Sequence, residues 1–229
     1  MITGIGIKTY YSIQHAQAAA YFARQASSIE SNPDDETEQA RVALHAYVAS
    51  TLFSSVAFLE ALANELYADA AQPDGGHLSA LPERDRALIA ELGATETIQK
   101  APVLSKFDLL LRGAGKAALP KDRAPYQVTA TLIRLRNEIV HYKASFFDIG
   151  SEGMVRPGNF NDSNLSEQVR NLFPHRIKPR GWAADNWMSS GCARWAVTTA
   201  VTHADAVFHA MSIDPYYNHV RASLDLNSK

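Results

Sequence analysis

The feature that most constrains the fold is a helical apolar pattern that recurs along most of the chain. Its longest stretch covers residues 38–71, where apolar and small side chains follow one another at intervals of three and four positions. They are Leu44, Val48, Leu52, Ser55, Leu59, Leu62 and Leu66. This spacing places them on one side of an α-helix, and that side has to be buried against other helices. The pattern therefore predicts a long amphipathic helix in an all-helical protein.

Turn and capping signals divide the rest of the chain into further helices. Asn32-Pro33 is a stop signal after an alanine-rich segment, and Thr37 offers a capping hydroxyl to the long helix. The predicted helices cover residues 12–29, 38–71, 83–92, 103–112, 122 or 125 to 145, and 186–212.

Residues 148–185 carry three prolines and little periodicity, so we expect a long irregular excursion with at most one short helix, near residues 165–173. No segment shows a convincing strand pattern. The prediction is a single all-α domain over residues 1–229, an up-and-down bundle of four to five main helices with the excursion before the last one.

Composition indicates a soluble protein that has no general attraction to nucleic acid. The chain has 229 residues, of which 46% are apolar and 20% charged, and its formal net charge is −2. RNA contact would therefore depend on a local patch or on a groove between subunits. The single cysteine, Cys192, fits a reducing compartment. No secretory signal is recognisable and no apolar run is expected to reach membrane-spanning length, so we expect a cytoplasmic protein without a membrane partner.

The most informative motif, RNEIVH, places Arg136 and His141 five positions apart on the helix predicted to end near residue 145. A guanidinium that is always charged and an imidazole that titrates near neutral pH are suited to cleaving a phosphodiester without a metal. Positions around this helix can be given as angles on a helical wheel, with about 100° per residue and Arg136 at zero. The predicted core face is then centred at about −80° and His141 lies at about +140°, so His141 points away from the core.

A second apolar strip lies on the side of this helix that carries His141. Its members are Ala130, Ile133, Val140 and Ala144. A helix with two apolar strips is usually buried on two sides. One side can contact the chain's own core and the other a partner subunit or the excursion, which leads us to infer a homodimer with the motif at its interface.

Residues 135–141, with the sequence LRNEIVH, resemble the signature of the HEPN superfamily. Residues 54–66, with the sequence SSVAFLEALANEL, also look like the early helix of that family. HEPN proteins are helical bundles, commonly dimeric, and the resemblance covers two helices, or roughly a quarter of the chain. For many members it implies metal-independent endoribonuclease activity in toxin–antitoxin, abortive-infection or other antiphage systems. Other members bind without cutting, so the fold alone does not establish an activity.

Carried over to this chain, the resemblance implies that Arg136, Asn137 and His141 form the catalytic set, with no metal or cofactor. His141 would exchange a proton with the ribose 2′-OH or the leaving 5′-oxygen, and Arg136 would offset charge on the phosphate. Asn137 would orient the histidine ring or a phosphate oxygen. The expected partners are RNA, a second copy of the chain and an antitoxin or regulatory protein.

Three further positions are candidates for supporting roles. Glu60 and Asn64 share a face of the long helix, and Glu60 is expected either to position Arg136 or to form an ordinary polar pair at the bundle edge. Tyr142 follows His141 directly. HEPN toxins with nucleotidyltransferase antitoxins often carry a tyrosine two positions after the histidine, where this chain has Lys143, so control by modification of a tyrosine there is doubtful.

Other interpretations compete with a nuclease site. Glu138-x-x-His141 has the spacing of a di-iron bundle ligand pair, but no second Glu-x-x-His exists, and no zinc motif is present. A basic cluster in the excursion could contact RNA phosphates or be a solvated loop; its main members are Arg176, Lys178 and Arg180. Arg136 and His141 could also lie on a solvated, salt-bridged helix face. The alternative functions are a non-catalytic HEPN-like dimer that binds a protein or nucleotide, and a purely structural helical protein.

Overall fold

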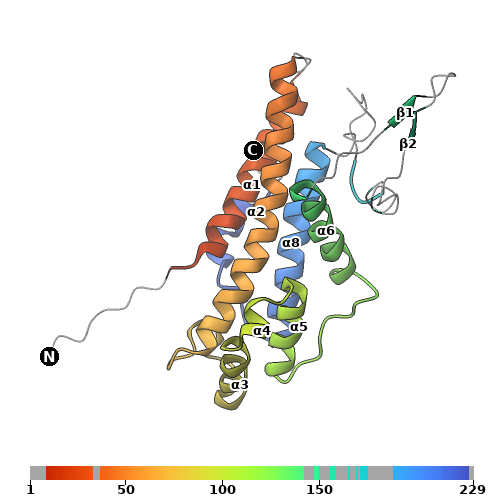
Figure 1. Ribbon diagram of the computed structural model, residues 1–229. Coiled ribbons are helices and arrows are strands. Elements are labelled where there is room, and N and C mark those ends of the chain that lie inside the picture. The colour runs from red at the N-terminus through yellow and green to blue at the C-terminus, as the bar shows by residue number, and fades with distance from the viewer. Residues whose placement is uncertain are drawn as a thin grey trace.

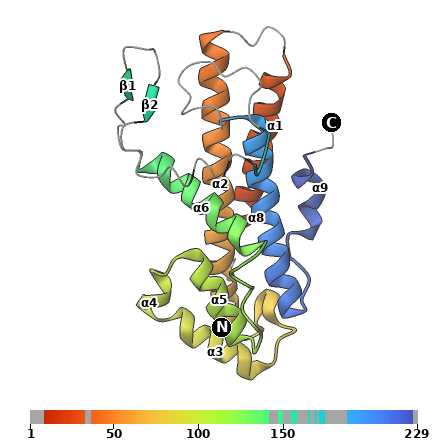
Figure 2. The same cartoon turned by 90° about the vertical axis from the view of Figure 1, so that its right-hand side faces the viewer.

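The structure, a computed structural model, describes residues 9–32, 37–141, 147–149, 155–157, 165, 169, 171–174 and 188–226. They form an elongated helical bundle (Figure 1; Figure 2). The helices are α1 (Tyr11–Glu30), α2 (Glu38–Ala70), η1 (Gly76–Leu78), α3 (Glu83–Gly93), α4 (Glu96–Gln99), α5 (Val103–Gly113), α6 (Tyr126–Val140), α8 (Ser190–Met211), η3 (Asn218–Val220) and α9 (Arg221–Leu224). The predicted all-α bundle is confirmed.

Helix α2 is the centre of the bundle, and α1, α8, α3, α5 and α6 all contact it. The predicted apolar face is the buried face: Leu44, Val48, Leu52, Ser55, Leu59, Leu62 and Leu66 are each 0–1% exposed. Thr37 caps the helix, because its side chain accepts a hydrogen bond from the Ala40 amide at 3.1 Å. On α1 every buried position after Ser12 is an alanine, which lets the two helices run close together (Figure 1); these are Ala16, Ala19, Ala20, Ala23 and Ala26.

By length and composition, α2 is also able to cross a membrane. An 18-residue window of this helix has a mean hydropathy of 1.6, so the expectation that no apolar run reaches membrane-spanning length is wrong for α2. No second helix of this kind occurs in the described part of the chain. The same composition follows from its central place, because a helix covered on several sides by other helices has to be apolar on each of them.

The short helices α3, α4 and α5 close one end of the bundle (Figure 2). Gly113 lies where α5 passes α3, and a Cβ atom there would come within 2.8 Å of Ile89 Cγ1. Any larger residue at this position would therefore require the Ile89 side chain to shift. Thr95 caps α4 by accepting a hydrogen bond from the Ile98 amide at 3.4 Å. This compact end holds α5 against α2.

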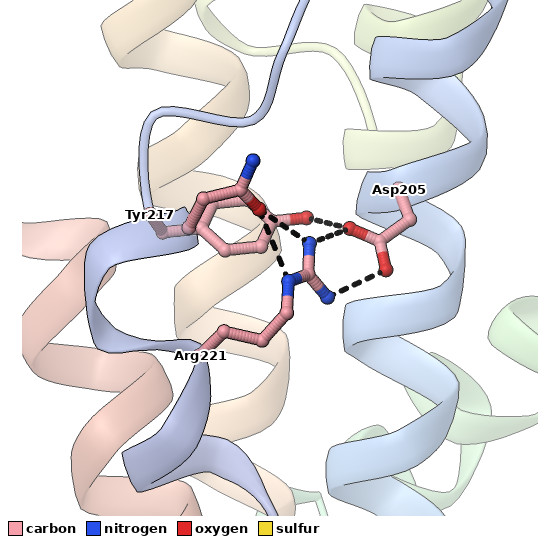
Figure 3. Close-up of polar contacts among 4 residues, drawn as sticks. Asp205, Tyr217 and Arg221 are labelled. Carbon is pink, nitrogen blue, oxygen red and sulfur yellow. Dashed lines mark hydrogen bonds and ion pairs between the residues drawn. The ribbon is translucent and has the colours of Figure 1, made fainter.

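The segment after α8 folds back along the bundle (Figure 2) and is held by an ion-pair network (Figure 3). Arg221 donates to both carboxylate oxygens of Asp205, at 2.7 and 3.0 Å. The Tyr217 hydroxyl donates to the same carboxylate at 2.6 Å, and the Arg221 guanidinium also reaches the Asn218 side chain. The bidentate pair anchors η3 and α9 to α8. The sequence pattern did not lead us to expect ordered structure after α8.

Two short strands lie in the excursion, where no strand was expected. β1 (Phe147–Ile149) pairs antiparallel with β2 (Val155–Pro157), with Asp148 opposite Arg156. Each strand has three residues, which is too short to show an alternating apolar pattern. Leu165 and Val169 are helical and buried, in agreement with the first part of the expected short helix; residues 166–168 and 170 lie outside the described part. Residues 171–173 form a turn and a bend, so the expected helix does not extend to residue 173.

Candidate functional site

Helix α6 carries the Arg136–His141 motif and crosses the bundle obliquely (Figure 2). It was expected to continue to about residue 145, but it ends at Val140. His141 is the residue directly after the helix, with φ −108° and ψ 31°, and its amide still donates to the Asn137 carbonyl at 2.8 Å. The histidine therefore lies at the end of the helix rather than within it, so the neighbouring backbone hinders its side chain less than a helical interior would.

The three motif side chains differ in their access to solvent. Asn137 and His141 are exposed, whereas Arg136 is partly covered, with 23% of its side chain exposed. No described residue forms a hydrogen bond or ion pair with the His141 imidazole in this structure. Among the described residues, neither ring nitrogen is therefore engaged, and the His141 side chain is exposed.

Arg136 is held by Glu60 of α2. Its Nη2 donates to Glu60 Oε1 at 2.6 Å, and the Glu60 side chain is 49% exposed. An ion pair this exposed stabilises the fold by less than about 1 kcal/mol. Its main consequence is geometric, because it fixes the guanidinium at the α2–α6 contact and joins the two segments that carry the sequence motifs. Of the two interpretations of Glu60, the one in which it contacts Arg136 agrees with this ion pair.

Part of the guanidinium is still able to bind a ligand. Arg136 Nε is buried and has no hydrogen-bond partner among the described residues. An unpaired buried donor is unfavourable by about 1–3 kcal/mol. Because Glu60 engages Nη2 and Nε is buried, Nη1 is the nitrogen of the guanidinium left for an anion.

Asn64, one turn beyond Glu60 on α2, contacts a second cation. Its Oδ1 accepts a hydrogen bond from Lys106 Nζ of α5 at 2.8 Å. Asn64 is exposed, but Lys106 is only 7% exposed, so its ammonium lies where the core meets solvent. The candidate site is therefore a row of four side chains from three helices: Arg136, Glu60, Asn64 and Lys106.

Lys106 was not among the residues predicted from the sequence, although a signal was present. The apolar side of α5 is made by Val103, Leu104, Phe107, Leu110 and Leu111, all buried. Lys106 is three positions after Val103 and four before Leu110, so it lies on that apolar side. A lysine on the buried face of an amphipathic helix is uncommon and is a recognisable sign of a special environment.

The second apolar strip on α6 was predicted to contact a partner subunit or the excursion, but half of it contacts the chain's own core. Ala130 and Ile133 are partly buried and pack against the chain's own core. Val140 is 51% exposed, and Ala144 lies outside the described residues. The buried face of α6 consists of Thr129, Leu132 and Leu135. Among its described members, the strip therefore mostly widens the helix's contact with its own bundle, and Val140 is the one that is exposed.

Several predicted residues fall outside the described part of the chain. They are Tyr142, Arg176, Lys178 and Arg180. Within the described part, no group of three or more His, Cys, Asp or Glu side chains is placed to hold a metal ion. Glu138 and His141 are both exposed at the end of α6. Among the described residues, the structure thus brings together four side chains around the motif: Arg136, Glu60, Asn64 and Lys106.

No family model, curated protein or solved structure matches the chain.

Proposed function

We propose that this protein is a metal-independent endoribonuclease of the HEPN type that acts as a homodimer. The observation that carries the proposal is the 2.6 Å contact between Glu60 and Arg136. It joins the two HEPN-like segments at one place and presents Arg136 beside the exposed Asn137 and His141. Such a site suits a toxin or antiphage effector in the cytoplasm, restrained by an antitoxin or regulatory protein.

The residue types fit cleavage by transesterification. One His141 imidazole takes the proton from a ribose 2′-OH, and the 2′-oxygen forms a bond to phosphorus. The bond from phosphorus to the 5′-oxygen breaks, and that oxygen receives a proton from a second imidazole in its charged form. Arg136 offsets the negative charge that develops on the phosphate oxygens, and Asn137 orients the ring or a phosphate oxygen. The products are a 2′,3′-cyclic phosphate and a 5′-hydroxyl.

This scheme needs two imidazoles, and each chain supplies one in the motif. A second copy of the chain, joined across the exposed end of α6, would supply the other. Two exposed apolar side chains support that contact: Val140 next to His141, and Phe53, which is 38% exposed on α2 two turns before Glu60. Apolar side chains beside an exposed polar site are typical of an interface between subunits.

The purified protein is expected to cut single-stranded RNA in the presence of EDTA. Because the scheme uses only protein side chains, chelation should leave the rate unchanged. Fragments separated on a denaturing gel, with and without acid treatment to open a cyclic phosphate, test both the activity and the chemistry. DNA of the same sequence is the control, since it lacks the 2′-OH. Absence of cleavage, or equal cleavage of DNA, would exclude this mechanism.

A second candidate function is a non-catalytic HEPN-like dimer that binds a partner protein or nucleotide. The observation that favours it is the same ion pair, because Glu60 already neutralises Arg136 when no ligand is bound. Overexpression in a bacterial host separates the two candidates. A binding module leaves growth unchanged, whereas an active toxin arrests growth and loses this effect with the His141→Ala substitution.

Glu60 is expected to act as a positioning residue rather than to contact RNA. Glu60→Ala removes the acceptor for Arg136 Nη2, so kcat should fall about tenfold through looser placement of the guanidinium. Glu60→Gln keeps an acceptor oxygen at the same place and should retain kcat within a few fold. In both variants the lost negative charge lowers KM by reducing repulsion of the phosphates. Steady-state kinetics measure kcat and KM separately for each variant. An equal loss of kcat in both variants would contradict a positioning role.

A further inference from the structure

The buried ammonium of Lys106 has no counter-ion among the described residues. It donates to the neutral Asn64 side chain, and no carboxylate of the described residues pairs with it. The nearest acid along α5, Asp108, is already used, since its Oδ2 lies 3.0 Å from Lys121 Nζ. A covered charge without an opposite partner is unfavourable in a resting fold. An anionic ligand would remove that disadvantage.

Lys106 is also well placed relative to the proposed nuclease site. Glu60 and Asn64 are four residues apart on α2, which corresponds to a rise of about 6 Å along one helical face. Glu60 holds Arg136 and Asn64 holds Lys106, so the residues that hold the two cations lie one helical turn apart on the same face of α2. This arrangement suits a chain of regularly spaced negative charges.

We propose that Lys106 is a phosphate-binding residue that holds the RNA strand one nucleotide away from the phosphate at Arg136 and His141. This inference rests on the proposed nuclease function and extends it to the length of substrate that the site engages. Asn64 then serves as the residue that aims the ammonium along the α2 edge. A single strand is the expected substrate form, because its backbone is free to follow the row of side chains.

The salt dependence of RNA binding tests this proposal. The His141→Ala protein is titrated with a labelled single-stranded RNA of twelve nucleotides in EDTA at several NaCl concentrations. Adding Lys106→Gln should weaken binding about tenfold at low salt. It should also reduce the slope of log K against log salt by about 0.7, the value for one lost phosphate contact on a single strand. Lys116→Gln, at an exposed position beyond the end of α5, is the matched control and should change neither quantity.

Further variants keep the test decisive if Lys106→Gln fails to fold. Asn64→Asp changes only an exposed position, yet it places a carboxylate beside the ammonium and should lower affinity and slope similarly. Lys106→Arg should retain most of the binding. Equal affinity and slope in Asn64→Asp and its parent would overturn the assignment of Lys106.

Failure of this inference is distinguishable from failure of the nuclease proposal. Cleavage by the wild-type protein with unaltered binding in the Lys106 and Asn64 variants excludes only the phosphate contact. Binding that depends on Lys106 in a protein that never cuts RNA supports the contact and excludes the nuclease. A protein that neither binds nor cuts RNA excludes both.

Discussion

Replacement of His141 by alanine is expected to lower the rate of RNA cleavage about a thousandfold, the usual range for loss of a general acid or base. The fold should be unaffected, because this side chain is exposed after the end of α6 and contacts no described side chain through a hydrogen bond. Exposed substitutions of this kind change stability by no more than about 0.5 kcal/mol. Single-turnover cleavage in EDTA, together with a thermal melt, measures both quantities.

The matched control is His209→Ala, which makes the same chemical change at an exposed histidine of α8. It should leave the cleavage rate at the wild-type level. If His141→Ala also cuts at that level, the histidine has no part in the reaction. If His141→Ala is inactive but melts well below the wild-type protein, its effect is on folding rather than on chemistry.

Mixing the two proteins tests whether the site is shared between subunits. When wild-type and His141→Ala chains are allowed to exchange at constant total concentration, random pairing makes the active dimers proportional to the square of the wild-type fraction. Activity per wild-type chain should therefore fall as the mutant fraction rises. A site complete within one chain would give constant activity per wild-type chain, and this result would remove the argument for a composite site.

The sequence pattern predicted the long helices well because each has a continuous buried face. The bounds of α1, α2 and α8 agree with the apolar spacing to within a few residues. The early end of α6 was not predictable in this way. No glycine or proline stands between Val140 and Ser145, so nothing local indicates that the helix stops. The short helix α4 had a local signal, the capping Thr95, but four residues are too few to show a period.

The candidate site was predictable only in part, for a related reason. Helical spacing shows that Glu60 and Asn64 share a face and that Arg136 lies beside the core face of its own helix. Whether Glu60 meets Arg136 depends on how α6 crosses α2, which no pattern within either helix determines. The contact between Asn64 and Lys106 depends in the same way on the placement of α5, which follows from packing at the closed end of the bundle.

The second large effect is expected from His203, a buried histidine of α8. It is 1% exposed, and neither ring nitrogen has a hydrogen-bond partner among the described residues. Its ring lies 5.3 Å from that of Phe107 and 6.4 Å from that of Tyr126, measured between centroids. Burial among these rings lowers the pKa of His203 from 6.5 to about 4, because the charged form loses its hydration.

This pKa difference makes the stability of the fold depend on pH. Below pH 6.5 the unfolded chain takes up a proton at this histidine and the folded chain does not, so the free energy of unfolding falls as the pH falls. The contribution of the neutral His203 to the free energy of unfolding is complete above pH 6.5 and is lost by about pH 4. Between pH 7.5 and 5 the loss should be about 2 kcal/mol, which corresponds to a decrease in melting temperature of roughly 4–8 °C.

The variant His203→Leu isolates this effect. Leucine fills a similar volume and leaves no unpaired ring nitrogen, so the variant should be at least as stable as the wild type at pH 7.5. Its free energy of unfolding should also no longer fall by about 2 kcal/mol between pH 7.5 and 5. His209→Leu, at an exposed position of the same helix, should keep that decrease. Urea unfolding at a series of pH values gives the comparison. If the His203→Leu and wild-type curves stay parallel down to pH 5, the histidine is hydrated or paired in the folded state, and the helix packing around it is looser than this structure indicates.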